Sequence, residues 1–340
     1  MDRMKQNPIE ISYLILAPYK PKTPSGKPTA FKKPIYAPYF FDVDIEFVLL
    51  EAKKVKIGSV DVGIEIEVLD GEVLAAQCSY LLEAGLSEAG LKEKDEINKK
   101  LYNMVIEDMG IKDNLVEEYA ALLIKDLKTS PEEYVKANKY LLARMAKSLE
   151  QKIDDSEVDD ILSSYANYSK SDMTIIDWET AIIIAKAGDV ESDLELIKIG
   201  NYQLIRYRML DRLLNQRIAD MSALIDSPKS GIFRRDKDML RKVVHSQIEL
   251  ILHFDKIDQS LLLIGDWYSA KLYRMIIKEL YIEQWKANVK EKLNTLTSID
   301  EIVRNSLTFS WSRVLEAFQT GGWILLLLGY FALFFLELQR

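Results

Sequence analysis

The sequence predicts an α+β protein: a small antiparallel β-rich N-terminal domain, then long antiparallel helices, then one C-terminal transmembrane helix. Three observations predict this. Residues 60–68 alternate strictly between apolar and polar, apolar residues recur at helical spacing from about residue 90, and residues 317–336 contain no charge. The hydrophobic content of 48% and charged content of 29% are ordinary for a globular protein and exclude wholesale disorder.

The β-rich domain is predicted over residues 1–90. Residues 42–47 and 60–68 alternate with period two, which places an apolar row on a core and an acidic row in water. Asp70-Gly71 predicts a tight turn and residues 73–82 a returning strand. Residues 11–41 hold six of the nine prolines and no acidic residue, so most of this stretch is predicted to be an extended loop.

That loop carries a local positive charge on a chain whose net charge is −8. Anionic lipid headgroups and ribosomal RNA are both candidate targets, at about 1 kcal/mol per lysine near a charged membrane surface. The acidic balance of the whole chain argues against general nucleic-acid binding. The candidate contacts to an anionic surface are Lys20, Lys22, Lys27, Lys32 and Lys33.

A helical region is predicted over residues 91–188. Asn114 with Glu117, and Ser130 with Glu133 after Pro131, resemble capping boxes at helix starts. Residues 174–185 are rich in β-branched side chains and are predicted as a strand or hairpin that returns to the N-terminal sheet.

Residues 189–312 are predicted to form a stalk of long helices. Ile282, Val289, Leu296 and Val303 recur every seven residues, a coiled-coil stripe suited to helix packing and self-association. Residues 297–301 also have the pattern of a fresh N-cap, which leaves open whether the last helix is continuous or kinked there. The arginines between residues 206 and 217 are predicted to lie on a solvated face.

A Gly-Asp-Trp sequence interrupts this helical region. Gly265 predicts a close approach of two helices, because glycine costs about 1 kcal/mol against alanine in a helix. Asp266 would need a cationic or hydrogen-bonded partner if buried, and Trp267 is predicted to belong to the same packing site.

No catalytic constellation is recognisable in the sequence. Cys78 is predicted to be a small core residue, and one cysteine excludes an internal disulfide. His245 and His253 are eight residues apart and lack acidic partners at ligand spacing. Residues 24–28, Pro-Ser-Gly-Lys-Pro, lack the upstream glycine and the Ser or Thr of a phosphate loop. The sequence therefore predicts no enzyme, no metal and no cofactor.

Residues 313–340 are predicted to be a C-terminal membrane anchor. The uncharged stretch of twenty residues would span roughly 30 Å as a helix, about the thickness of a bilayer core. No secretory signal precedes it, so the body is predicted to face the cytoplasm on a single-pass membrane protein. The residues expected within the anchor are Trp323, Leu326, Tyr330 and Phe334.

Four segments of the second half of the chain have distinctive sequences. They are SDMTIIDWETAIIIA (171–185), GNYQLIRYRMLDRLLNQRI (200–218), IGDWYSAKLYR (264–274), and Trp285 with Val289, Lys292, Leu293 and Leu296. These segments resemble a group of uncharacterised prokaryotic proteins with a C-terminal anchor, which is distantly similar to the required-for-meiotic-nuclear-division family. The resemblance covers about residues 172–338. It implies an α/β N-terminal part, long helices, one membrane span and a scaffolding role, and it brings no catalytic residues. The sequence departs from the pattern after Glu316, where six residues separate it from Trp323.

These observations favour a membrane-anchored scaffold or adaptor that faces the cytoplasm, binds the lipid bilayer, self-associates through its long helices and recruits a protein partner not readable from sequence. A component of a membrane transport or channel assembly is the alternative. It lacks the second span and Gly-Met-Asn signature of magnesium channels. A membrane-tethered hydrolase is a third reading, without a recognisable nucleophile and base.

Overall fold

The computed structural model describes residues 8–19, 27–29, 45–125, 127–185, 190–225, 252, 255 and 267–338. For residues 223–225, 300–315, 317 and 332–338 it describes the backbone alone. The chain divides into two compact units. The first comprises Met1–Asp211 and Leu240–Asn288, and the second Arg212–Met239 and Val289–Arg340.

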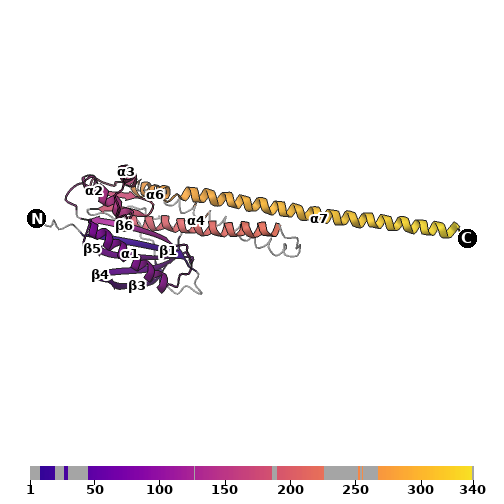
Figure 1. Cartoon of the computed structure of the whole chain (residues 1–340), viewed down its shortest axis with the longest axis horizontal. Coiled ribbons are helices and arrows are strands. Elements are labelled where there is room, and N and C mark those ends of the chain that lie inside the picture. The colour runs from indigo at the N-terminus through magenta and orange to yellow at the C-terminus, as the bar shows by residue number, and fades with distance from the viewer. Residues whose placement is uncertain are drawn as a thin grey trace. The chain divides into compact units, whose positions relative to one another are not determined.

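The first unit is built on a mixed sheet (Figure 1). Nine strands of the described chain pair in the order β2-β3-β4-β5-β1-β6-β9-β8-β7. Neighbours are antiparallel except for β6 and β9, which are parallel. The strands are β1 (Ile9–Pro18), β2 (Lys27–Thr29), β3 (Phe47–Ile57), β4 (Val60–Leu69), β5 (Val73–Leu82), β6 (Glu117–Lys125), β7 (Tyr165–Ala166), β8 (Asp172–Ile176) and β9 (Thr180–Ala185).

The hairpin of β4 and β5 follows directly from the local sequence. Asp70 and Gly71 both have positive φ, 48° and 66°, as a type I′ turn requires. Leu69 therefore pairs with Val73, and the strands stay in register to Val62 and Tyr80. The prediction of a β-rich N-terminal region in an α+β chain is confirmed.

The sheet continues beyond residue 90. The prediction of a helix start at Asn114 and Glu117 is wrong, because Glu117 is the first residue of β6. β6 pairs with β1 on one side and with β9 on the other, which places the apolar run 119–124 in the middle of the sheet. Burial there favours a strand over the helix start that the capping pattern suggested. Within residues 174–185 the chain forms parts of β8 and β9, and β9 joins the sheet beside β6.

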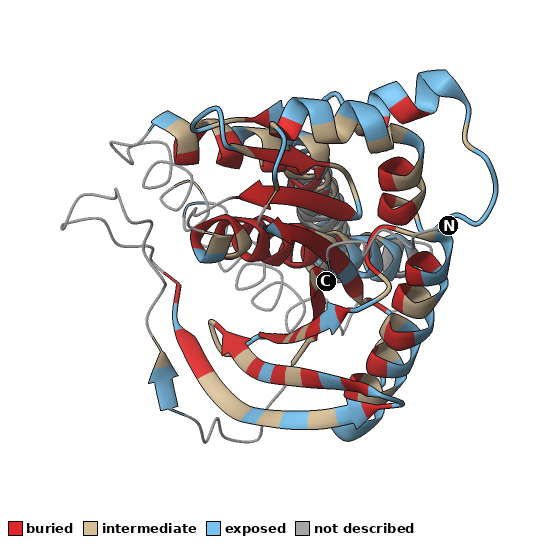
Figure 2. Cartoon of the chain, turned by 90° about the vertical axis from the view of Figure 1, so that its left-hand side faces the viewer, coloured by how far each residue is buried: buried red, intermediate tan, exposed pale blue. Residues whose placement is uncertain are grey.

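Helices α1 (Glu88–Asp108) and α2 (Pro131–Ala146) cover one face of the sheet. Ser130 and Glu133 form the predicted capping box of α2. The short α3 (Asp155–Ile161) packs on α2. Figure 2 shows the central strands buried almost throughout, whereas β3 alternates toward the solvent. The core between sheet and helices includes Ile11, Ile64, Cys78, Leu101, Leu122, Leu142 and Ile182.

The opposite face of the sheet is covered by α4 (Val190–Ile225) and α6 (Trp267–Glu279). Strand residues whose side chains lie on the face opposite α1 and α2, such as Glu67 and Thr174, contact these two helices. A Cβ atom added to Gly200 of α4 would lie 2.3 Å from Cγ2 of Ile276 in α6. Gly200 is therefore the position that permits close approach of the two helices.

Helix α7 (Ile282–Leu338) is continuous. The hydroxyl of Thr297 donates to the carbonyl of Leu293 at 2.9 Å, and that of Ser298 to Asn294 at 3.0 Å. These side chains thus bond back into their own helix and do not cap a new one. Of the seven-residue stripe, Ile282, Val289 and Leu296 are at most 1% exposed.

The prediction of a C-terminal transmembrane helix is wrong. Over the part of the chain that the structure describes, no helix is both long and apolar enough to cross a membrane. The charge-free stretch belongs to a 57-residue helix and includes Gln319, Thr320 and three glycines, so the absence of charge overstated its apolar character. The single-pass membrane localisation with a cytoplasmic body, which rested on this anchor, is corrected by the same finding.

Gly200→Ala should destabilise the fold, because the new methyl overlaps a side chain that is 1% exposed. The expected loss is roughly 1–3 kcal/mol of unfolding free energy, measured by chemical denaturation. Gly63→Ala is the matched control, since its Cβ would meet nothing nearer than 3.9 Å. Adding Ile276→Ala to Gly200→Ala should return part of its loss. Equal stability of the two alanine variants would contradict the close approach.

Cys78 should be unreactive in the folded protein. It is fully buried in the core, and burial raises the pKa of its thiol to about 12. Because only about one thiol in ten thousand is ionised at pH 8, a disulfide reagent such as DTNB should titrate it only after denaturation. Native-state reaction at the rate of the denatured chain would show that the core opens around β5.

Candidate functional site

The lysines predicted to meet an anionic surface are largely outside the described residues. This holds for Lys20, Lys22, Lys32 and Lys33. Lys27 lies on β2, is exposed, and pairs through its backbone with Leu49 at the edge of the sheet. Contact with an anionic surface remains a prediction.

Of the predicted Gly-Asp-Trp packing site, the structure describes Trp267 and not Gly265 or Asp266. Trp267 begins α6, is 58% exposed, and stacks on Tyr168 at 6.4 Å between ring centroids. The neighbouring Tyr268 hydroxyl donates to Asp193 of α4 at 2.9 Å. The aromatic residues of this motif therefore tie α6 to the turn before β8 and to α4.

Of the predicted anchor residues, Trp323, Leu326 and Tyr330 lie on α7 and are 64, 70 and 71% exposed. The side chain of Phe334 is outside the described set.

The face of α4 that packs on the sheet is unusually polar. Lys198 is 4% exposed and donates to Glu195 on its own helix and to Glu67 on β4, both at 2.9 Å. Burial alone would lower the pKa of Lys198, but the carboxylates of Glu195 and Glu67 together raise it. The ammonium therefore stays charged between two carboxylates inside the protein.

Ion pairs continue along α4. Arg206 is 8% exposed and pairs with Glu72, and Arg208 pairs with Glu117 of β6. Burial lowers the pKa of Arg206 and raises that of Glu117. The prediction of a solvated arginine face is wrong for these two residues, because the acids that pair with them lie more than 90 residues away and leave no local signal.

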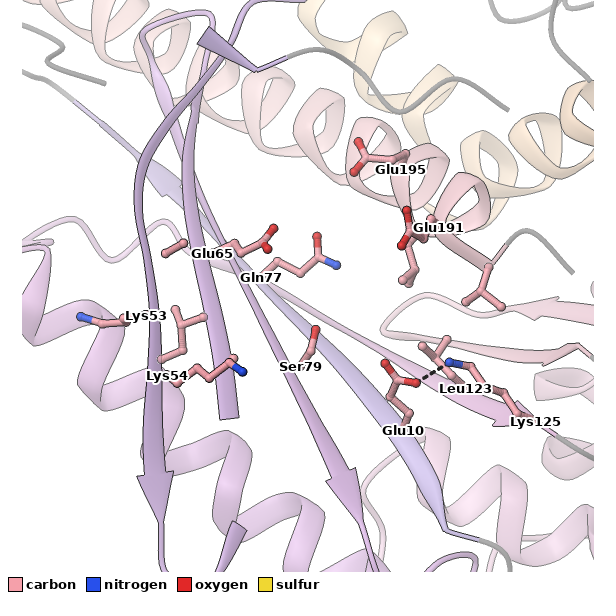
Figure 3. A pocket seen from close by; sticks show the side chains of 15 residues that line it. Glu10, Lys53, Lys54, Glu65, Gln77, Ser79, Leu123, Lys125, Glu191 and Glu195 are labelled. Carbon is pink, nitrogen blue, oxygen red and sulfur yellow. Dashed lines mark hydrogen bonds and ion pairs between the residues drawn. The ribbon is translucent and has the colours of Figure 1, made fainter. Parts of the chain in front are cut away.

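A groove of about 440 Å³ lies between the N-terminal end of α4 and the strands (Figure 3). Glu191 and Glu195 of α4 stand opposite Glu65 and Gln77. Lower in the groove, Lys125 donates to Glu10 at 2.5 Å. Acidic and basic groups alternate here and partly neutralise one another, so the groove presents no single charge for a ligand.

A second hollow, of about 540 Å³, lies on the opposite face of the sheet. The buried side chain of Lys94 on α1 donates to Ser148 Oγ at 2.5 Å and to Asp95 at 3.2 Å. Burial lowers the pKa of Lys94, against the raising effect of Asp95. Aromatic rings of Tyr13, Tyr102, Tyr119 and Trp178 also line this hollow. This pair leaves no local signal in the sequence, because 54 residues separate its members.

Within the described ranges, no three or more His, Cys, Asp or Glu side chains are grouped so that they could hold a metal ion. Several acids of the site are instead paired with cations or hydroxyls. Glu10, Glu67, Glu72, Glu117 and Glu195 pair with lysines or arginines, and Asp193 accepts from hydroxyls.

The fold defines an α+β protein with a mixed sheet between two helical layers. Its residues 42–190 match the family model described as "Uncharacterized protein MJ0711, N-terminal domain". The chain is 26% identical over 204 residues to the uncharacterised protein MJ0711 of Methanocaldococcus jannaschii. The alignment covers 60% of this chain and 62% of that protein, so it spans less than two thirds of the relative. No solved structure matches.

These comparisons support the prokaryotic part of the resemblance, to an uncharacterised protein similar to MJ0711. They do not show similarity to the required-for-meiotic-nuclear-division family or membrane anchoring. The family match also lies mostly before residue 171, where the segments that carry the resemblance begin.

Lys198→Met should leave Glu195 and Glu67 buried without their cation and lower the unfolding free energy by about 3–5 kcal/mol. Because the folded-state pKa of Lys198 is raised, its contribution should be complete below the ordinary lysine pKa and be lost as pH rises through the raised value. Chemical denaturation of the parent and the variant at a series of pH values from about 8 to 12 measures this. Lys278→Met, which removes a lysine with a side chain 77% exposed, is the control and should change little. Equal effects of the two variants would contradict a buried triad.

Proposed function

We propose that this chain is a self-associating scaffold whose C-terminal helical segment joins copies of the protein, so that several sheet-containing units are available to a protein partner. The proposal rests on an exposed apolar segment of α7. Nine apolar residues of this segment are each between 52 and 81% exposed: Phe318, Trp323, Ile324, Leu325, Leu326, Leu327, Leu328, Tyr330 and Phe331. A contiguous apolar surface of this kind is rare on a monomeric protein and is typical of an interaction site.

A second copy of the chain is the occupant that the pattern favours. Seven-residue steps from the buried Val289 and Leu296 lead in phase to Ile324 and Phe331. Leu328 lies four residues after Ile324, which completes the spacing of a coiled-coil seam. Because residues 317–336 carry no charge, two parallel copies in register would bring identical apolar layers together without repulsion.

The transport alternative predicted from sequence lacks comparable support, because a transport assembly would need membrane-spanning segments, which no described helix supplies. A scaffold needs only a self-complementary surface and a folded body. The exposed apolar segment of α7 and its seven-residue spacing support the first requirement, and the sheet of the first unit supplies the second.

Ile324→Glu with Leu328→Glu should dissociate the assembly, because it places two charges in the seam of each copy. The measurement is sedimentation velocity of the full chain at about 1–50 µM. The expected result is a dimer or larger species for the parent and a monomer for this variant.

The matched control is Leu326→Glu with Tyr330→Glu, which has the same charges and spacing on another side of the helix. It should remain associated. A monomeric parent chain, or equal dissociation of the two double variants, would overturn the proposal.

A further inference from the structure

We propose that Ser148 and Lys94 form a serine–lysine dyad that hydrolyses a small carboxylic ester or amide bound in the hollow they line. This activity goes beyond the scaffold function and does not depend on it. Both residues lie in the first unit, Lys94 on α1 and Ser148 two residues after α2.

The geometry fits a nucleophile and its base. Lys94 Nζ and Ser148 Oγ are 2.5 Å apart, within the reach required for direct proton transfer. The Lys94 side chain is 1% exposed, whereas Ser148 is exposed and accessible to a substrate. Serine is a weak nucleophile unless a neighbouring base removes its proton, and a neutral lysine serves this role in serine–lysine hydrolases.

Lys94 must be neutral to act as a base. Burial favours the neutral amine and lowers the pKa of Lys94, while the nearby carboxylates of Asp95 and Glu179 oppose this effect. Asp95 is the closer opponent, with its oxygen 3.2 Å from Nζ. The other charged or titratable groups that line the hollow are Lys99, Glu117, Glu118, Tyr13, Tyr102 and Tyr119.

The backbone at Ser148 is held in a defined turn at the end of α2. Its φ is +51°, in the left-handed region where glycine is preferred and serine is uncommon. Two hydrogen bonds between Leu149 and Arg144 fix the turn. The N–H of Leu149 donates to the carbonyl of Arg144, and the carbonyl of Leu149 accepts from Arg144 Nε. Arg144 is itself paired with Glu88 of α1. A residue with positive φ directly after the C-cap, followed by the hydrogen bond from the N–H of Leu149, is a common ending of an α-helix, and here it fixes the position of the Ser148 hydroxyl beside Lys94.

The reaction balances with water as the only co-substrate. Ser148 Oγ bonds to the carbonyl carbon while its proton moves to Lys94 Nζ. The tetrahedral intermediate then expels the alcohol or amine, which takes that proton. Water attacks the acyl-serine in the same way and releases the carboxylic acid, which restores both side chains.

The hollow also offers a donor for the developing oxyanion. Asn98 lies one helical turn after Lys94, on the same side of α1. Its Oδ1 accepts from the Tyr80 hydroxyl at 2.7 Å, which orients the amide and leaves its NH₂ group as donor. The aromatic rings of Tyr102 and Trp178 give the same hollow apolar walls for the acyl group.

A fluorophosphonate probe tests the dyad in the full chain, because phosphonylation uses the same attack, with fluoride as the leaving group. The parent protein should gain one adduct, which peptide mass spectrometry places on Ser148, and should hydrolyse p-nitrophenyl butyrate. Ser148→Gly should abolish both while raising the melting temperature, because glycine removes the hydroxyl and accepts the positive φ. Ser171→Ala, which changes an exposed serine of the β7–β8 turn, should leave both reactions unchanged.

Lys94→Met distinguishes a base from a structural residue. Labelling should fall by about 10²–10⁴-fold, and the rise of the parent's labelling rate with pH should disappear. Asp95→Asn should move that rise to lower pH, because it removes a carboxylate that favours the charged lysine. Absence of an adduct on Ser148, persistence of the adduct in Ser148→Gly, or unchanged pH dependence in Lys94→Met would overturn the dyad. The oligomeric state of the parent is independent of every one of these results.

Discussion

Buried ion pairs between α4 and the sheet constrain the packing of the first unit. Lys198 lies between Glu195 and Glu67, and each of these groups would be costly inside the protein without the others. Arg208 and Glu117 repeat the arrangement on β6. Apolar contacts tolerate small shifts, whereas paired charges with fixed donors do not. This interface therefore sets the position of α4, and through Gly200 the position of α6.

Features encoded within a few residues were predictable. The Asp70-Gly71 turn and the Ser130 capping box depend on neighbours in the sequence, and both appear as predicted. Asn114 and Glu117 show the limit of such signals, because pairing of β6 with two distant strands overrode a local capping pattern. The mistaken membrane helix has another cause: absence of charge was taken for apolar character in a stretch that contains glycine, threonine and glutamine.

The candidate site was not predictable, because it consists of pairs distant in sequence. Lys94 and Ser148 have no shared motif, and the close helix approach lies at Gly200, whereas the sequence drew attention to Gly265. The family match at 42–190 contains every residue that lines the hollow around Lys94 except Tyr13, and it ends at the first residue of α4. The residues of the proposed dyad thus lie inside the matched segment, while the charged face of α4 lies beyond it.

The central place of β1 has a consequence for how the chain acquires its structure. β1 pairs with β5 on one side and β6 on the other, so the first strand of the sheet can pair only after residues 55 to 113 positions later in the chain have been synthesised. The antiparallel series from β3 to β5 needs only short connections and is the natural nucleus, whereas the parallel β6–β9 pair requires a long loop closure. At ribosomal rates of about 5–20 residues per second, β1 would remain exposed for several seconds during synthesis. Its apolar run from Tyr13 to Ala17 is therefore a segment of the nascent chain that a chaperone would protect from aggregation.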